Sequence, residues 1–153
     1  MGILKSKRFR GQSIHRLDDK GRLRIPTKFR EILQECYTDG LVLAMRKDHL
    51  EAYPPEEWEQ IEDKLLKKVA FNKEVREFVR YFVSSAMECE FDKQGRILIP
   101  ALHRERAGIH QEVVLVGVLD SFEIWDTNRW HKDLEAAGER YDQTFSEVAR
   151  LVE

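Results

Sequence analysis

The chain contains one sequence segment twice. Residues 18–26 read Asp-Asp-Lys-Gly-Arg-Leu-Arg-Ile-Pro and residues 92–100 read Asp-Lys-Gln-Gly-Arg-Ile-Leu-Ile-Pro, so Asp, Gly, Arg, Ile and Pro recur 74 positions apart. The similarity continues 72 positions apart, where residues 48–58 correspond to 120–130 and both segments end in tryptophan. A unit of roughly 45 residues buries too little apolar surface to fold alone, so we expect both copies to complete one core. Such an internal pseudo-dimer favours a two-fold or tandem binding surface over a catalytic cleft.

Length and composition indicate a soluble globular protein. The 153 residues suit one compact domain or two small fused ones, and 42% of them are hydrophobic while 35% are charged. The two cysteines, Cys36 and Cys89, occupy positions that do not correspond between the copies. This pattern is typical of reduced thiols in a cytoplasmic protein.

No part of the sequence is typical of a membrane protein. No apolar run approaches the ~18 residues that span a bilayer, and the N-terminus lacks the apolar core of a signal peptide. Residues 1–6 match the M-G-x-x-x-S pattern for N-myristoylation, and basic residues follow them. That pattern is short and common, and no other feature indicates lipidation. We therefore expect no membrane partner.

Positive charge is concentrated at the N-terminal end. The net charge of the whole chain is −2, but ten of its 26 Lys and Arg residues lie within residues 1–30, against only two of its 28 Asp and Glu residues. A basic patch on an acidic protein is an electrostatic footprint for a polyanion. A solvated basic face without a partner is the alternative.

The hydrophobic pattern predicts an α+β fold. Residues 22–25 alternate strictly, which places Leu23 and Ile25 inward and both arginines outward on a strand. We expect Thr27 to cap a short helix that ends near Leu33, and Asn72 to cap a helix of the segment between the copies. The predicted organisation is repeat 1 at residues 12–56, inter-repeat helices at 57–84, repeat 2 at 85–128 and a C-terminal helical segment, broken near Gly138, at 129–153.

No pattern indicates an enzyme, a metal site or a cofactor. The five histidines never fall at H-x-x-x-H spacing, and the chain lacks a G-x-S-x-G elbow, a P-loop and a G-x-G-x-x-G motif. Asp18 and Asp92 each precede Gly-Arg at a turn, where an aspartate supplies backbone hydrogen bonds with Gly21 or Gly95 at the tight position. We therefore interpret them as turn residues, which either orient the following arginine or simply hold the turn, and not as a catalytic pair.

Several basic residues instead suit nucleic-acid recognition. A two-stranded ribbon fits the major groove of B-DNA, and an arginine can bind guanine with two hydrogen bonds. Arg22 and Arg24 project from one strand face, and Lys20 and Lys28 flank them as candidate phosphate contacts. Arg10 and Arg16 extend the same cationic track. Internal ion pairs are the alternative for Arg22 and, more strongly, for Arg96.

The second copy lacks several of these basic residues. Lys20 corresponds to Gln94, Arg24 to Leu98 and Arg16 to Glu90. The first copy is therefore predicted to read DNA, and the second to act as scaffold or oligomer interface.

These motifs, together with Phe9-Arg10-Gly11 and Phe122-Glu123-Ile124-Trp125, resemble the MraZ family of bacterial regulators. The resemblance implies two SpoVT-AbrB units folded as an intramolecular swapped-hairpin barrel and assembled into a homo-oligomeric ring. It also implies a cytoplasmic, nucleoid-associated repressor of a division and cell-wall gene cluster, which binds G-rich direct repeats in double-stranded promoter DNA. The family's DNA-contacting arginine falls on Arg22, with Lys20 beside it. An antitoxin-like, protein-binding scaffold remains the alternative, because a fold does not fix a function.

Overall fold

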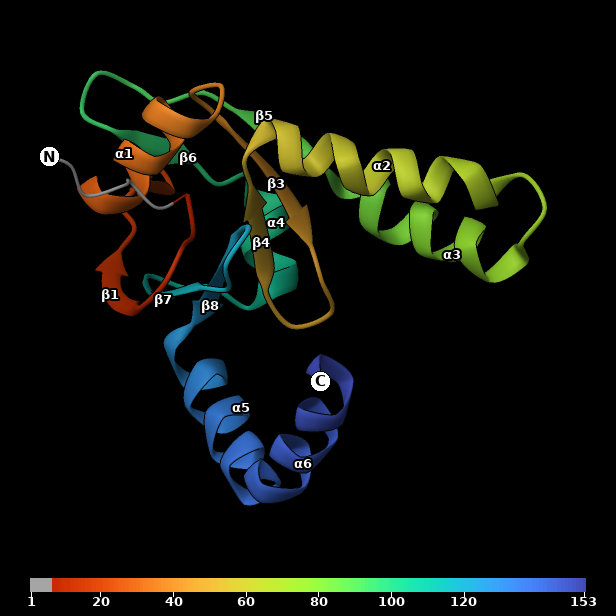
Figure 1. Ribbon diagram of the computed structural model, residues 1–153. Coiled ribbons are helices and arrows are strands. Elements are labelled where there is room, and N and C mark those ends of the chain that lie inside the picture. The colour runs from red at the N-terminus through yellow and green to blue at the C-terminus, as the bar shows by residue number, and fades with distance from the viewer. Residues whose placement is uncertain (1–6) are drawn as a thin grey trace, which may run out of the picture.

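The two sequence copies fold into the same series of elements in the computed structural model, which describes residues 7–153 (Figure 1). The first series is β1 (Gln12–Arg16), β2 (Arg22–Arg24), α1 (Thr27–Cys36), β3 (Leu41–Met45), β4 (Leu50–Tyr53), α2 (Pro55–Val69) and α3 (Lys73–Phe82). After a 3₁₀ turn, η1 (Val83–Ser85), the second is β5 (Met87–Cys89), β6 (Arg96–Leu98), α4 (Ala101–Ala107), β7 (Glu112–Gly117), β8 (Phe122–Asp126), α5 (Thr127–Glu139) and α6 (Tyr141–Val152). The α+β class is confirmed. The myristoylation pattern lies outside the described residues.

The strands of the two copies are interleaved. One six-stranded sheet has the order β1-β7-β8-β4-β3-β5, and β2 and β6 form a separate two-stranded ribbon. Strand β1 thus pairs with the second copy, β5 pairs with the first, and β4 pairs with β8 at the centre, all antiparallel. The arrangement is pseudo-two-fold about the β4–β8 pair. The sheet is open, with β1 and β5 as its edges, so a closed barrel is not confirmed.

One hydrophobic core is shared by both copies, as expected. Leu23 and Ile97 from the ribbon are buried together with Leu43 and Leu115 from the sheet. Phe9 is fully buried in this core, where its ring lies edge-on to Phe29 at 5.2 Å and tilted to Phe122 at 5.5 Å. The core therefore holds the ribbon against the sheet from within.

The inter-repeat and C-terminal helices project away from the sheet in two different directions (Figure 1). Trp58 of α2 belongs to a small buried cluster with Tyr53 and Phe82. Trp130 of α5 occupies the corresponding position and is buried with Trp125. Both tryptophans anchor a helix to the sheet.

One of the two predicted helix caps is confirmed. Asn72 caps α3, since its side-chain oxygen accepts a hydrogen bond from the backbone N–H of Val75 at 2.9 Å. Thr27, however, does not cap α1: Pro26 occupies the N-cap position without a side-chain hydrogen bond, and the helix continues past Leu33 to Cys36. The buried face of the helix, Phe29, Ile32 and Leu33, ends at Leu33, and the last three residues of the helix are exposed. Among the described residues, no helix combines the length and apolarity needed to span a bilayer.

Candidate nucleic-acid interface

The ribbon formed by β2 and β6 has one buried and one exposed face. Its register places Arg22 opposite Leu98, Leu23 opposite Ile97 and Arg24 opposite Arg96. Leu23 and Ile97 point into the core, so the other four side chains share the opposite face. We call Arg22, Arg24, Arg96 and Leu98 the outer face of the ribbon. This face combines three guanidinium groups with one exposed leucine.

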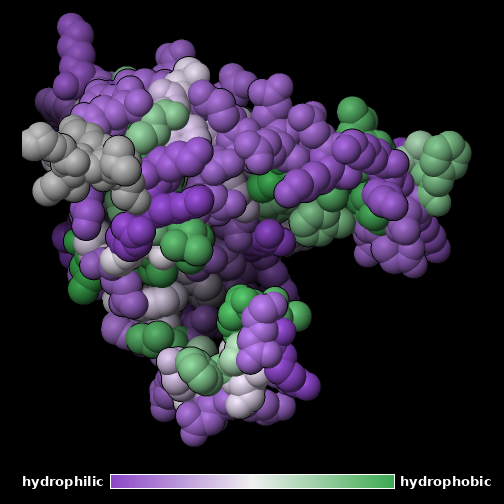
Figure 2. Space-filling view, viewed as in Figure 1, coloured by the Kyte–Doolittle hydropathy of each residue, from purple (hydrophilic) through white to green (hydrophobic). Residues whose placement is uncertain are grey.

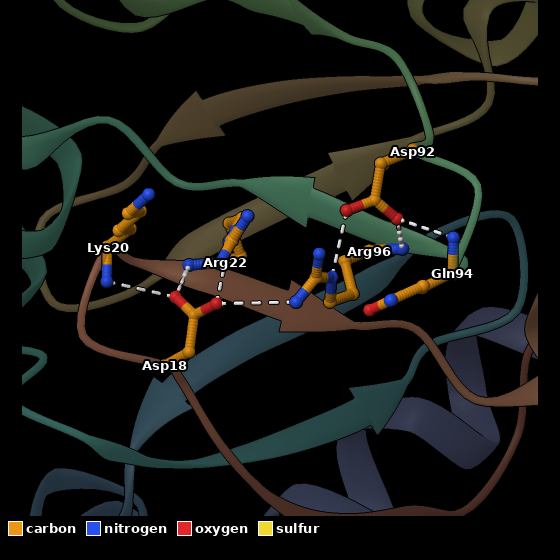
Figure 3. Close-up of polar contacts among 6 residues, drawn as sticks. All are labelled: Asp18, Lys20, Arg22, Asp92, Gln94 and Arg96. Atoms are coloured by element: carbon orange, nitrogen blue, oxygen red, sulfur yellow. Dashed lines mark hydrogen bonds and ion pairs between the residues drawn. The ribbon is translucent and has the colours of Figure 1, made fainter.

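Asp18 builds the turn that precedes β2 and holds Arg22 at the same time (Figure 3). One carboxylate oxygen, Oδ1, accepts hydrogen bonds from the backbone N–H groups of Lys20 and Arg22 at 3.0 and 2.9 Å. The other, Oδ2, accepts from Nε of the Arg22 guanidinium at 2.6 Å. Gly21 completes the turn with φ +85°, in the left-handed region that favours glycine. The turn and the orientation of Arg22 therefore both involve a single carboxylate.

The charge of this carboxylate is stable across the physiological pH range. The backbone N–H of Arg22, reinforced by its guanidinium, lowers the pKa of Asp18 to about 2. Asp92 makes the corresponding contacts with Arg96, and its pKa is likewise lowered. Both turns thus keep an ionised acceptor for their arginine near neutral pH.

The second turn repeats this geometry but leaves its arginine less available. Oδ1 of Asp92 accepts from the backbone N–H groups of Gln94 and Arg96, both at 2.9 Å, and Oδ2 accepts from Nε of Arg96 at 2.8 Å. Arg96 also donates through Nη1 to Asp18 at 3.5 Å (Figure 3). Within residues 7–153, the ion pairs of Arg22 involve only Nε of its guanidinium, whereas those of Arg96 involve two nitrogens, Nε and Nη1. An arginine has five N–H donors in a fixed fork, so Arg22 retains more of them for an external acceptor.

Each turn is braced by an arginine from a helix of the other copy. A Cβ atom added to Gly21 would lie 2.8 Å from Cζ of Arg104, and one added to Gly95 would lie 3.2 Å from Nη1 of Arg30. Arg30 is neutralised by Asp39, with nitrogen–oxygen distances of 3.1 and 3.2 Å. Arg104 donates to the carbonyl of Ile99 at 3.1 Å. The guanidinium of Arg104 therefore adds positive charge beside the first turn.

The other predicted contacts lie in the first turn, on α1, and on or just before β1. The side chain of Lys20 is exposed in the first turn, and Lys28 is exposed in the first helical turn of α1. Arg10 is exposed just before β1. Arg16 lies on the edge strand β1, where it donates to the side chain of Gln111 at 2.6 Å and faces Glu112 at 3.9 Å. The charge of Arg16 is therefore partly compensated within the fold.

Sequence reasoning did not predict that both copies would contribute to one exposed face. Arg96 lies 74 positions after Arg22 in the sequence, whereas in the structure their two strands, β6 and β2, pair with each other. Sequence reasoning also gave no role to Arg104. The available signal was the equal spacing of Arg30 and Arg104, which is again 74 positions; interleaved strands could not be read from either copy alone.

A second group of charged residues lies at the centre of the sheet, where β4 pairs with β8. Glu51 and Glu123 are directly opposite each other, and Nε2 of His49 lies 3.4 and 3.3 Å from their carboxylates. Nε of Arg46 lies 2.9 Å from a carboxylate oxygen of Glu51, and the His49 ring stacks on the Trp125 ring with centroids 4.3 Å apart. Histidine spacing in the sequence gave no indication of this group. Two opposed carboxylates repel each other, so the positive charge of His49 stabilises the β4–β8 strand pair that connects the two copies.

This contact predicts a pH-dependent stability. Burial alone would lower the pKa of His49, but the carboxylates of Glu123 and Glu51 outweigh it and raise the pKa to about 9. The folded state therefore binds this proton more tightly than the unfolded chain, so the contribution is complete below about pH 6.5 and is lost as the pH rises through about 9. We expect the melting temperature of the wild type to fall between pH 6.5 and 9.5 more than that of His49→Gln. Parallel decreases in the two proteins would contradict this assignment.

Comparison with known proteins now identifies the family. A family model described as "MraZ protein, putative antitoxin-like" matches residues 8–81 and again residues 82–149, so the chain consists of two tandem family units. The chain belongs to the MraZ family. This is a family of transcriptional regulators and not of enzymes, as expected from the sequence.

Curated relatives named "Transcriptional regulator MraZ" cover most of the chain. The protein from Syntrophobacter fumaroxidans is 55% identical over 141 residues, which is 92% of this chain and 94% of the relative. The proteins from Halothermothrix orenii and Caldicellulosiruptor bescii are 44% and 45% identical, over 88% and 81% of this chain and 92% and 85% of their own lengths. The two matches to the family model, at residues 8–81 and 82–149, span both turns and both strands of the ribbon.

Proposed function

We propose that this transcriptional regulator binds double-stranded DNA in a sequence-specific manner through the outer face of the ribbon. The observation that carries the proposal is the guanidinium of Arg22, which Asp18 orients through Nε at 2.6 Å while the side chain stays about one-third exposed. A side chain held in position before binding loses less conformational entropy when it binds. Its remaining N–H donors match N7 and O6 of guanine in the major groove.

The surrounding charges support the same surface. Arg24 is exposed on the outer face of the ribbon, and no ion pair to it is found within residues 7–153. Lys20 and Lys28 flank the ribbon as phosphate contacts, and Arg10 and Arg16 extend the cationic surface. Contacts with phosphates fix the register of a protein on DNA without reading its sequence.

We further propose that several subunits bind neighbouring G-rich direct repeats at once. A single ribbon is expected to bind weakly, and linked ribbons raise the effective concentration of each further contact. A closed ring cannot apply all of its ribbons to straight DNA, so the ring opens or the DNA bends. In this proposal the protein is a cytoplasmic, nucleoid-associated repressor of a division and cell-wall gene cluster, and its interleaved units are the swapped-hairpin arrangement that the family resemblance implies.

Exposed apolar side chains support self-assembly. Phe71 in the loop between α2 and α3 is 96% exposed, and Phe145 and Leu151 of α6 are also exposed. Figure 2 shows apolar patches on the α2–α3 projection and near α6 on a surface that is otherwise mostly hydrophilic. Faces of this kind mark interfaces between proteins. Light scattering from the purified protein measures the size of the assembly.

The proposed function is tested by binding to duplexes that carry G-rich direct repeats, compared with scrambled duplexes, over a series of salt concentrations. Selective binding with a steep salt dependence is expected. Tight but unselective binding would leave only a general basic surface. Failure to bind either duplex at low salt would favour the protein-binding scaffold.

Lys28→Ala tests the phosphate contacts separately. We expect binding to weaken equally for matching and scrambled duplexes, and the slope of log K against log salt to become shallower by about 0.9 for each engaged subunit, because one phosphate contact is lost. Lys64→Ala removes the same charge from the exposed side of α2 and serves as the control. An unchanged slope in Lys28→Ala would remove this residue from the interface.

A further inference from the structure

The outer face of the ribbon contains one apolar side chain among its three arginines. Leu98 is 54% exposed although its strand neighbour Ile97 is fully buried. It lies directly opposite Arg22, the residue that we place on guanine. Single exposed leucines are common on protein surfaces. This one is distinguished by its place within the surface proposed to meet the bases.

Leu98 also breaks the pseudo-two-fold symmetry of the ribbon. It occupies the position in the second copy that Arg24 occupies in the first. A symmetric ribbon would present the same arginine pair from both strands. With leucine in one strand, the outer face carries an arginine pair, Arg24 and Arg96, at one end and the pair of Arg22 and Leu98 at the other. The two ends of the outer face therefore differ. An asymmetric face of this kind suits direct repeats better than inverted ones.

The chemistry of the major groove provides a matching apolar group. Guanine presents two acceptors there, whereas thymine presents the C5-methyl group, which apolar side chains contact. Paired residues in an antiparallel ribbon have Cα atoms about 4.5–5.5 Å apart, and successive bases rise by about 3.4 Å. Two side chains on opposite strands therefore reach bases that are one or two steps apart.

We propose that Leu98 is a specificity-determining residue that contacts the C5-methyl group of a thymine one or two base pairs from the guanine bound by Arg22. The inference rests on the proposed function. It adds a second base, a thymine, to the guanine that the protein is proposed to recognise. It gives the second copy a part in reading the sequence, in addition to its part in the fold.

The test uses thymine and deoxyuracil, which differ only in the C5-methyl group. The preferred duplex is first selected from a random pool with the wild-type protein, and a thymine is expected beside the selected guanines. Each thymine of the repeat is then replaced by deoxyuracil, one position at a time in every repeat. At one position we expect the wild type to lose about fourfold in affinity for each engaged subunit, the effect of burying one methyl group. Leu98→Ala is expected to bind the two duplexes equally.

Leu102→Ala is the matched control. Leu102 is 51% exposed on α4 outside the ribbon, so this variant removes a similar side chain and should keep the wild-type preference for thymine. A selected sequence without thymine near the guanines, equal binding of both duplexes by the wild type, or loss of the preference in both leucine variants would overturn the assignment. If Arg22→Ala abolishes selective binding while deoxyuracil has no effect, only the role of Leu98 fails. If the wild type selects no sequence, the proposed function fails as well.

Discussion

Arg22→Ala is expected to abolish selective binding to G-rich direct repeats. The substitution removes a guanidinium that Asp18 already orients, and each bidentate contact with guanine is worth about 1–3 kcal/mol of discrimination. The loss occurs in every engaged subunit, so a duplex with several repeats should lose far more affinity than a duplex with one. Measuring affinity against repeat number, for matching and scrambled duplexes, gives the loss per subunit.

Two further variants separate geometry from charge. Arg22→Lys keeps the positive charge but loses the planar fork, so it should retain binding to scrambled DNA and lose the preference for guanine. Arg76→Ala removes one exposed arginine from α3, far from the ribbon, and should bind like the wild type. If Arg22→Ala and Arg76→Ala weaken binding equally, Arg22 contributes only general charge and does not read the sequence.

Phe9→Ala is expected to have the largest effect on stability. Phe9 precedes the first strand, yet its side chain is fully buried and its backbone pairs with Leu119 through hydrogen bonds of 2.8 and 2.9 Å. Truncating a buried phenylalanine costs about 3–5 kcal/mol, because the lost contacts leave a cavity. For a chain of this length the melting temperature should fall by about 6–20 °C, which thermal denaturation followed by circular dichroism measures.

Ile14→Ala is the control for this measurement. Ile14 lies on the neighbouring strand β1 but is 63% exposed, so its truncation should change stability by less than about 0.5 kcal/mol. Equal melting temperatures for the two variants would mean that the segment before β1 is not part of the core. Because Arg10 follows Phe9 directly, Phe9→Ala should also weaken DNA binding at temperatures where the protein remains folded.

The local features of the site could be predicted from the sequence because they depend on short-range chemistry. Asp at the first turn position, Gly at the fourth and strict alternation in residues 22–25 predict the turn, the buried Leu23 and the exposed Arg24. The internal repeat further predicts that whatever holds Arg22 also holds Arg96, and the structure shows Asp18 and Asp92 in equivalent roles. These features need no knowledge of which strands pair.

The composite nature of the site could not be predicted in the same way. Whether β2 pairs with its own copy or with the other depends on long-range packing, and the alternation of side chains is identical in both cases. The placement of Arg104 against Gly21 and of Glu51 opposite Glu123 follows from that pairing. Thr27 shows the same limit on a smaller scale. Threonine is a suitable N-cap residue, but the helix begins at Thr27 itself, so Pro26 occupies the N-cap position.

The interleaving of strands also determines when the protein can fold during synthesis. Strand β1 pairs only with β7, which brings Gln12 to Val116, so the N-terminal strand has no partner in the sheet until most of the chain has left the ribosome. Contacts between residues so distant in sequence form slowly, since a long loop must close first. Until then, the apolar faces of the first unit remain uncovered. The nascent chain therefore passes through a stage in which half of the regulator is made and the two-stranded ribbon, which needs both β2 and β6, cannot yet form.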